Sequence, residues 1–228
     1  MRLPLGLEWP RLAFAVIGFL PITALAVALF GWVPLHVTAK ALVLPSIPLA
    51  LGLAWRYPGW GRIALMGFLA GVVATAAYDA TRLAMVWLGL WPDFIPAIGQ
   101  MAALDDAAHP IWGYLWRFVG NGGGMGLTFA MLTHGGLKLG RPGTRLGMAY
   151  GAAICCCLWG TLVFAPGAQD KLFPLNLLTA AFSMLGHLDF GAVLGFLTRQ
   201  WLGAPEGTAE RLVPQAAGAR EADAEALP

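Results

Sequence analysis

Long apolar runs separated by short polar turns are the dominant pattern along this 228-residue chain. A helix needs about 20 mainly apolar residues to cross the hydrocarbon core of a bilayer. Six runs approach or exceed this length, and the pattern therefore predicts an all-α integral membrane protein with a six-helix transmembrane bundle. The predicted spans cover residues 12–33, 35–55, 63–91, 111–134, 146–165 and 175–201.

The turns and ends complete the predicted organisation. Pro45 and Pro48 interrupt the second span, because each proline removes a backbone donor. The connection 92–110 is half apolar, and its spacing predicts a short interfacial helix around 97–108, between the third and fourth spans. Residues 1–203 would form one transmembrane domain. The Ala- and Glu-rich segment 204–228 has no periodicity, which predicts a disordered cytoplasmic tail.

Composition and charge support this picture. The chain is 58% hydrophobic and 11% charged, whereas a soluble domain has about 25% charged residues. A net charge of +2 without a basic stripe gives no reason to expect a nucleic-acid partner. Ten Lys and Arg residues fall on one side of the six spans and two on the other, which predicts cytoplasmic N- and C-termini. The chain resembles small bacterial inner-membrane proteins in general composition, so we expect it in such a membrane.

Ionisable residues inside the spans are the candidate chemistry. Asp79 and Arg82 lie three residues apart and so share a helix face. Ionisable groups inside a membrane are costly and are functional-site candidates by default. We expect Asp79 about 18 Å below the outer end of its helix. The predicted site opens outward and binds a ligand or relays protons through residues at overlapping depths: Asp79, Arg82, Arg117, Asn121, His187 and Asp189.

An architectural interpretation stays open for the same residues. Asp79 and Arg82 would neutralise each other, and Arg117 would extend toward the interface. Asn121 precedes three glycines, which favours close helix packing or, alternatively, a locally unwound backbone that binds a ligand. The Gly-x-x-x-Gly pattern of Gly67 and Gly71 also predicts close packing between helices.

A metal site is a weaker alternative. Asp105 and Asp106 are spaced to share a helix face with His109, and His187 would be a further ligand. Zinc sites need three or four converging ligands, and the three consecutive cysteines, Cys155 to Cys157, point in different directions on a helix. No cofactor-binding or catalytic motif is evident in the sequence.

Three functions follow from these patterns, and enzymatic activity stays open. The leading one is a membrane protein that binds or moves a small solute or ion, with Asp79 as the protonatable carboxylate. The second is a membrane-embedded enzyme, metal-dependent or not, that acts on a lipid-like or apolar substrate. The third is an accessory subunit of a larger membrane complex. The expected partners are the lipid bilayer, the solute, and either a second copy or a complex subunit.

Overall fold

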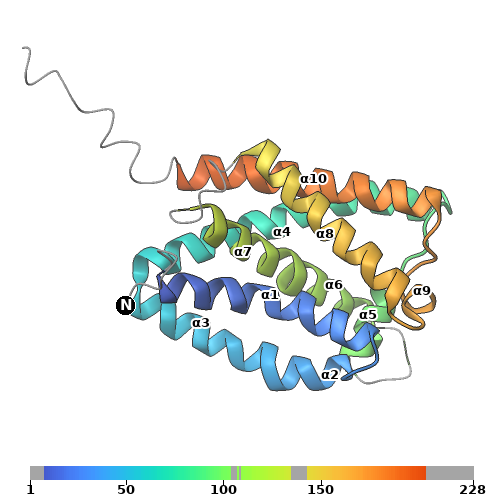
Figure 1. The fold of residues 1–228 in the computed structure, drawn as a ribbon, viewed down its shortest axis with the longest axis horizontal. Helices are drawn as coiled ribbons and strands as arrows, with labels where there is room; N and C mark the ends of the chain where they lie inside the picture. Colours follow the sequence, from blue (N-terminus) through green and yellow to red (C-terminus); the bar gives the residue numbers. More distant parts are fainter. Residues whose placement is uncertain (1–7, 104–106, 108, 135–142, 204–228) are drawn as a thin grey trace, which may run out of the picture.

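The computed structural model describes residues 8–103, 107, 109–134 and 143–203, and every regular element in this part of the chain is helical. This confirms the predicted all-α class. Five stretches are long and apolar enough to span a membrane. They are α1 (Trp9–Leu29), the run from α2 (Leu35–Thr38) through the π-helical η1 (Ala39–Val43) to α3 (Leu44–Arg56), then α4 (Pro58–Trp87), α8 (Thr144–Phe164) and α10 (Leu177–Leu202) (Figure 1).

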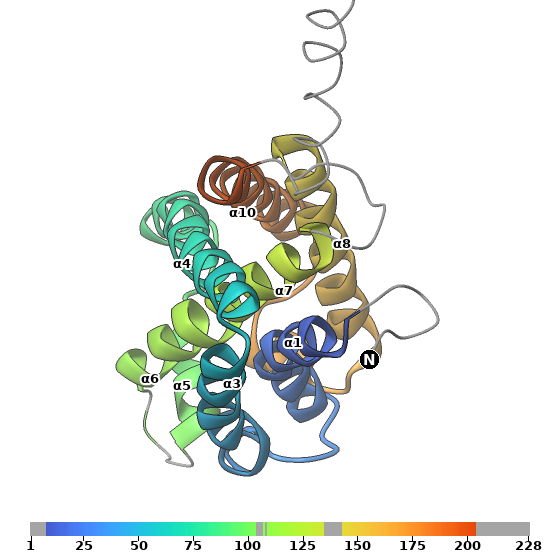
Figure 2. The same ribbon diagram turned by 90° about the vertical axis from the view of Figure 1, so that its left-hand side faces the viewer.

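The predicted fourth span is present as one helical run, but it is not among these five. It consists of α6 (Pro110–Leu115), the π-helical η2 (Trp116–Gly123) and α7 (Gly124–Thr133). Its arginine, asparagine and glycines make it more polar than the other spans. Figure 2 shows α7 in the middle of the bundle, and nine of its ten residues are buried. Because protein surrounds α7, its side chains do not need to be apolar enough for lipid.

Two predicted element boundaries shift for local reasons. Helix α4 begins at Pro58, five residues before the predicted start. A proline is favoured in the first turn of a helix, because the backbone N–H that it lacks would have no acceptor there. At the other end, Gly89 adopts a φ of 69°, a left-handed conformation that ends helices. The helix therefore stops at Trp87, and Trp91 is buried against Phe173, with ring centroids 5.2 Å apart.

The second span is interrupted by a π-helical turn, η1, which ends at Val43, two residues before Pro45. The missing N–H of a proline frees a carbonyl in the preceding turn. In the same stretch, the hydroxyl of Ser46 donates to the carbonyl oxygen of Val43 at 2.7 Å. Helix α3 lies at the edge of the bundle (Figure 2).

A short helix, α5 (Ile95–Ala103), lies between α4 and α6 where an interfacial helix was predicted over 97–108. Its Ile95 and Ile98 are buried in the core cluster between α1 and the chain around Phe173. The one-turn helix α9 (Ala168–Lys171) connects α8 to α10. The position of α5 at a membrane surface stays a prediction, as does the tail 204–228, which lies outside the described residues.

Glycines set the closest helix contacts. A Cβ added to Gly71 would lie 2.9 Å from the Cα of Gly126, and one added to Gly67 would lie 2.8 Å from the carbonyl oxygen of Gly126. These distances leave no room for a side chain. The packing interpretation of Gly67 and Gly71 is therefore confirmed, and their partner is the central helix α7. The glycines after Asn121 also pack closely; the backbone there is helical, but up to Gly123 it is a π-helix, which is wound more widely than an α-helix.

Candidate functional site

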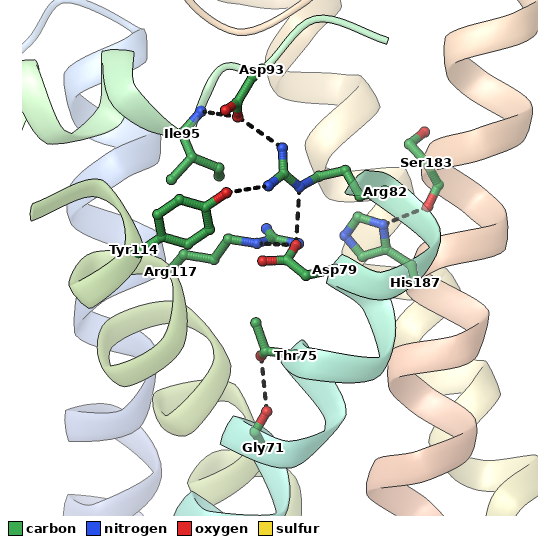
Figure 3. Close-up of polar contacts among 10 residues, drawn as sticks. All are labelled: Gly71, Thr75, Asp79, Arg82, Asp93, Ile95, Tyr114, Arg117, Ser183 and His187. Atoms are coloured by element: carbon green, nitrogen blue, oxygen red, sulfur yellow. Dashed lines mark hydrogen bonds and ion pairs between the residues drawn. The ribbon is translucent and has the colours of Figure 1, made fainter. Parts of the chain in front are cut away.

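Asp79 is the centre of a buried ion-pair cluster (Figure 3). Its Oδ1 accepts from Nε of Arg82 at 3.0 Å, one helical turn away on α4, and from Nε of Arg117 at 2.6 Å on η2. Nη2 of Arg117 lies 2.5 Å from the same oxygen. The other carboxylate oxygen, Oδ2, is buried and has no hydrogen-bond partner among the described residues. One carboxylate therefore holds two guanidinium groups from two helices.

Arg82 is fully buried and joins three segments of the chain. Besides Asp79, it donates to Oδ1 of Asp93 at 2.9 Å and to the hydroxyl of Tyr114 at 3.1 Å. The same oxygen of Asp93 accepts from the backbone N–H of Ile95, the first residue of α5. Neither Asp93 nor Tyr114 was predicted as a site residue. The sequence feature that could have identified Tyr114 is its position three residues before Arg117 in one predicted helix.

The cluster balances its own charge. Two carboxylates, Asp79 and Asp93, face two guanidiniums, Arg82 and Arg117. Removing one partner of a buried pair is costly because it leaves the other charge uncompensated. Asp79 is eight residues from the end of α4 at Trp87. Its depth below that end is about 12 Å at 1.5 Å per residue, less than predicted, because the helix ends early.

A cavity of about 400 Å³ lies next to the cluster. Most of its lining is apolar and comes from α1 and α8. One wall is polar and carries Thr75, Tyr78, Arg117, Asn121 and His187.

The cavity reaches the outer surface of the bundle between α1 and α8. Four lining residues are exposed there: Phe19 and Thr23 on α1, and Ala153 and Cys157 on α8. In a membrane-spanning bundle, such an edge faces lipid. The cavity therefore has a lateral opening and a polar inner wall.

Aromatic rings connect the cluster to His187. The guanidinium carbon of Arg117 lies 4.4 Å from the ring centroid of Tyr78, a cation–π contact. The Tyr78 ring in turn meets the His187 ring edge-on, with centroids 5.0 Å apart. His187 Nδ1 lies 2.7 Å from the carbonyl oxygen of Ser183. Asn121 is buried, and its Oδ1 has no hydrogen-bond partner in the described part of the chain.

The structure thus brings five of the six predicted residues together. Asp79, Arg82 and Arg117 interact directly, while Arg117, Asn121 and His187 line one cavity. Asp189 lies elsewhere, and its Oδ2 accepts from the hydroxyl of Thr81 at 2.9 Å. The offset of two residues from His187 explains this difference, because it turns the side chain by about 200° around α10.

The metal alternative is only partly covered by the structure. Asp105 and Asp106 lie outside the described residues, and His109 directly precedes α6. Across the described ranges, no group of three or more His, Cys, Asp or Glu side chains is placed to hold a metal ion. A metal site at Asp105, Asp106 and His109 stays a prediction.

Comparison with known proteins finds no family model, no curated protein and no solved structure that matches this chain. The class that the fold and the site define is therefore the broad one, a helical protein with several membrane-length apolar helices. Any narrower function rests on the chemistry of the cavity and the cluster.

Proposed function

We propose that this chain is a multi-pass membrane protein that binds a lipid-like molecule in the cavity between α1 and α8. The observation that carries this proposal is the combination of an apolar cavity of about 400 Å³, one polar wall and an exposed edge between two membrane-length helices. Ligand pockets typically have volumes of about 300–1,000 Å³. A molecule with an apolar body and one polar end matches this distribution of groups.

The sequence favoured a small solute or ion as the ligand, whereas the cavity favours a lipid-like molecule. A small ion must exchange its hydration shell for polar groups on several sides. Here the charged and amide groups gather on one wall, around Arg117 and Asn121, and the lining from α1 and α8 is mainly apolar, with three hydroxyl side chains: Thr23, Tyr150 and Thr161. The lateral opening would let a membrane-dissolved molecule enter directly from the bilayer.

The proposal includes the membrane topology. We take residues 110–133 as a sixth span, because they form one continuous helical run of membrane length whose α7 part lies in the middle of the bundle. With six spans, the distribution of Lys and Arg favours both termini in the cytoplasm of a bacterial-type cell. The polar wall then lies nearer the outer face.

Two neighbouring cysteines provide the test. Cys157 lines the cavity at its exposed edge, whereas Cys156 is also exposed but does not line it. One variant keeps only Cys157 (Cys155→Ala/Cys156→Ala) and its matched control keeps only Cys156 (Cys155→Ala/Cys157→Ala). Each is modified with a small maleimide in the presence of dodecyl amphiphiles that differ only in the head group.

We expect at least one of these amphiphiles to slow modification of Cys157 at concentrations that leave the rate at Cys156 unchanged. Equal rates at both cysteines throughout the series would refute binding in this cavity.

A further inference from the structure

Two residues of the polar wall, Asn121 and His187, carry a hydrogen-bond acceptor for which the described residues provide no donor. Asn121 is 9% exposed, and its Oδ1 has no partner in the described part of the chain. An amide oxygen buried in this way costs free energy until a donor reaches it. In a cavity of ligand size, that donor can belong to the bound molecule.

His187 supplies the second acceptor. Its Nδ1 lies 2.7 Å from the carbonyl oxygen of Ser183, which can only accept, so Nδ1 carries a ring proton. A second proton would add an uncompensated buried charge, which leaves Nε2 as an acceptor. Figure 3 shows this second nitrogen turned away from Ser183, toward Asp79 and Arg117. His187 therefore fits a ligand that donates.

Arg117 supplies donors on the same wall. Nε and Nη2 are directed to Oδ1 of Asp79, whereas Nη1 has no partner within the described ranges. A guanidinium group never accepts a hydrogen bond. The wall therefore offers donors and acceptors together, while the charge of Arg117 is already offset by Asp79.

We infer that the polar end of the ligand is an uncharged group that both donates and accepts hydrogen bonds, with a hydroxyl as the simplest example. This inference rests on the proposed lipid-like ligand and specifies its chemistry. An anionic head would meet Arg117 but would place its charge opposite the acceptors of Asn121 and His187 and near the carboxylate of Asp79. A cationic head would face Arg117 without a free anion.

The series of dodecyl amphiphiles separates the two proposals. Dodecanol, dodecyl phosphate and dodecyltrimethylammonium share one chain and differ in head-group charge. We expect dodecanol to protect Cys157 at a concentration about tenfold lower than the two charged molecules, the effect of one or two well-made hydrogen bonds. Stronger protection by dodecyl phosphate would overturn the uncharged head, whereas no protection by any of the three would overturn ligand binding itself.

Substitution of the two acceptors tests the assignment directly. Asn121→Leu removes an oxygen that has no described protein partner, so the ligand-free protein should unfold at the same or a higher temperature. Dodecanol should bind about tenfold more weakly. The matched control, Thr198→Val, removes another buried oxygen that has no described partner, but one outside the cavity, and should leave dodecanol binding unchanged.

A second variant covers the case in which Asn121→Leu does not fold. His187→Phe keeps an aromatic ring beside Tyr78 and removes Nε2, and we again expect about tenfold weaker binding of dodecanol. Unchanged dodecanol binding in the folded variants would overturn the inference.

Two sources of such a ligand share this chemistry, a diacylglycerol and a prenylated hydroquinone. Competition against dodecanol identifies which one the cavity accepts, and failure of both would overturn the hydroxyl head.

Discussion

Replacing Asp79 by Asn removes the charge on which Arg117 depends. Arg82 keeps a carboxylate partner in this variant, because Asp93 lies 2.9 Å from its Nη1. Arg117 has no second carboxylate among the described residues, and its side chain is only 13% exposed. The cation left uncompensated by Asp79→Asn is therefore Arg117.

The size of the effect follows from burial. Breaking a buried ion pair by removing one partner costs about 3–5 kcal/mol. Arg117→Gln leaves Asp79 paired with Arg82 and loses a charge-assisted hydrogen bond, a cost of about 1.5–3 kcal/mol. The double variant Asp79→Asn/Arg117→Gln contains no unpaired charge. We expect it to lie within about 2 kcal/mol of the wild type, which requires a coupling free energy of roughly 2.5–6 kcal/mol between the two sites.

Thermal unfolding of the purified protein, followed by tryptophan fluorescence in one detergent, measures this cycle. At about 2–4 °C per kcal/mol for a chain of this size, Asp79→Asn should lower Tm by roughly 6–20 °C, and the double variant should recover most of the loss. Arg62→Gln, an exposed arginine near the start of α4, is the control and should leave Tm unchanged. Additive effects of the two single substitutions would refute the shared buried pair.

Three further predictions concern the bundle itself. Gly71→Ala places a Cβ against the backbone of Gly122 on η2 and of Gly126 on α7 and should cost about 1–3 kcal/mol of stability; Gly52→Ala, which meets no atom within 4 Å, should be tolerated in the same unfolding assay. Arg11→Gln loses a buried side chain that donates to the carbonyl oxygens of Met131 and Leu132 at the end of α7, and should lower stability by about 1.5–3 kcal/mol. Reporters fused at 138–145 and at the C-terminus should give cytoplasmic signals, and one inserted at 98–106 an external signal; a cytoplasmic signal at 98–106 would contradict the topology.

The apolar spans were predictable from the sequence because lipid contact demands a long run of apolar side chains. The ion pair between Asp79 and Arg82 was also accessible, since spacing on one helix fixes which side chains meet. The helix ends were not. Gly89 stops α4 early and brings Asp93 back over Arg82, and this chain reversal leaves no periodic signal.

The contacts between helices were the other part that the sequence left open. Overlapping depths suggested that Arg117 lies near Asp79, but not that it depends on Asp79 alone. A cavity has no sequence signal, because it is defined by helices that do not touch. Residues as ordinary as Ala153 and Ile154 line this one.

The buried position of α7 has a consequence for biogenesis. The helical run that ends in α7 also contains η2, with Arg117, Asn121 and a run of glycines. Without protein partners, such a segment partitions poorly from the insertion machinery into lipid. Its packing partners α1 and α4 precede it in the chain, and their glycine surfaces are made before α7 is synthesised. We therefore expect α7 to enter the membrane against a surface of protein already inserted, so that a nascent chain lacking α1 would translocate this segment into the aqueous phase.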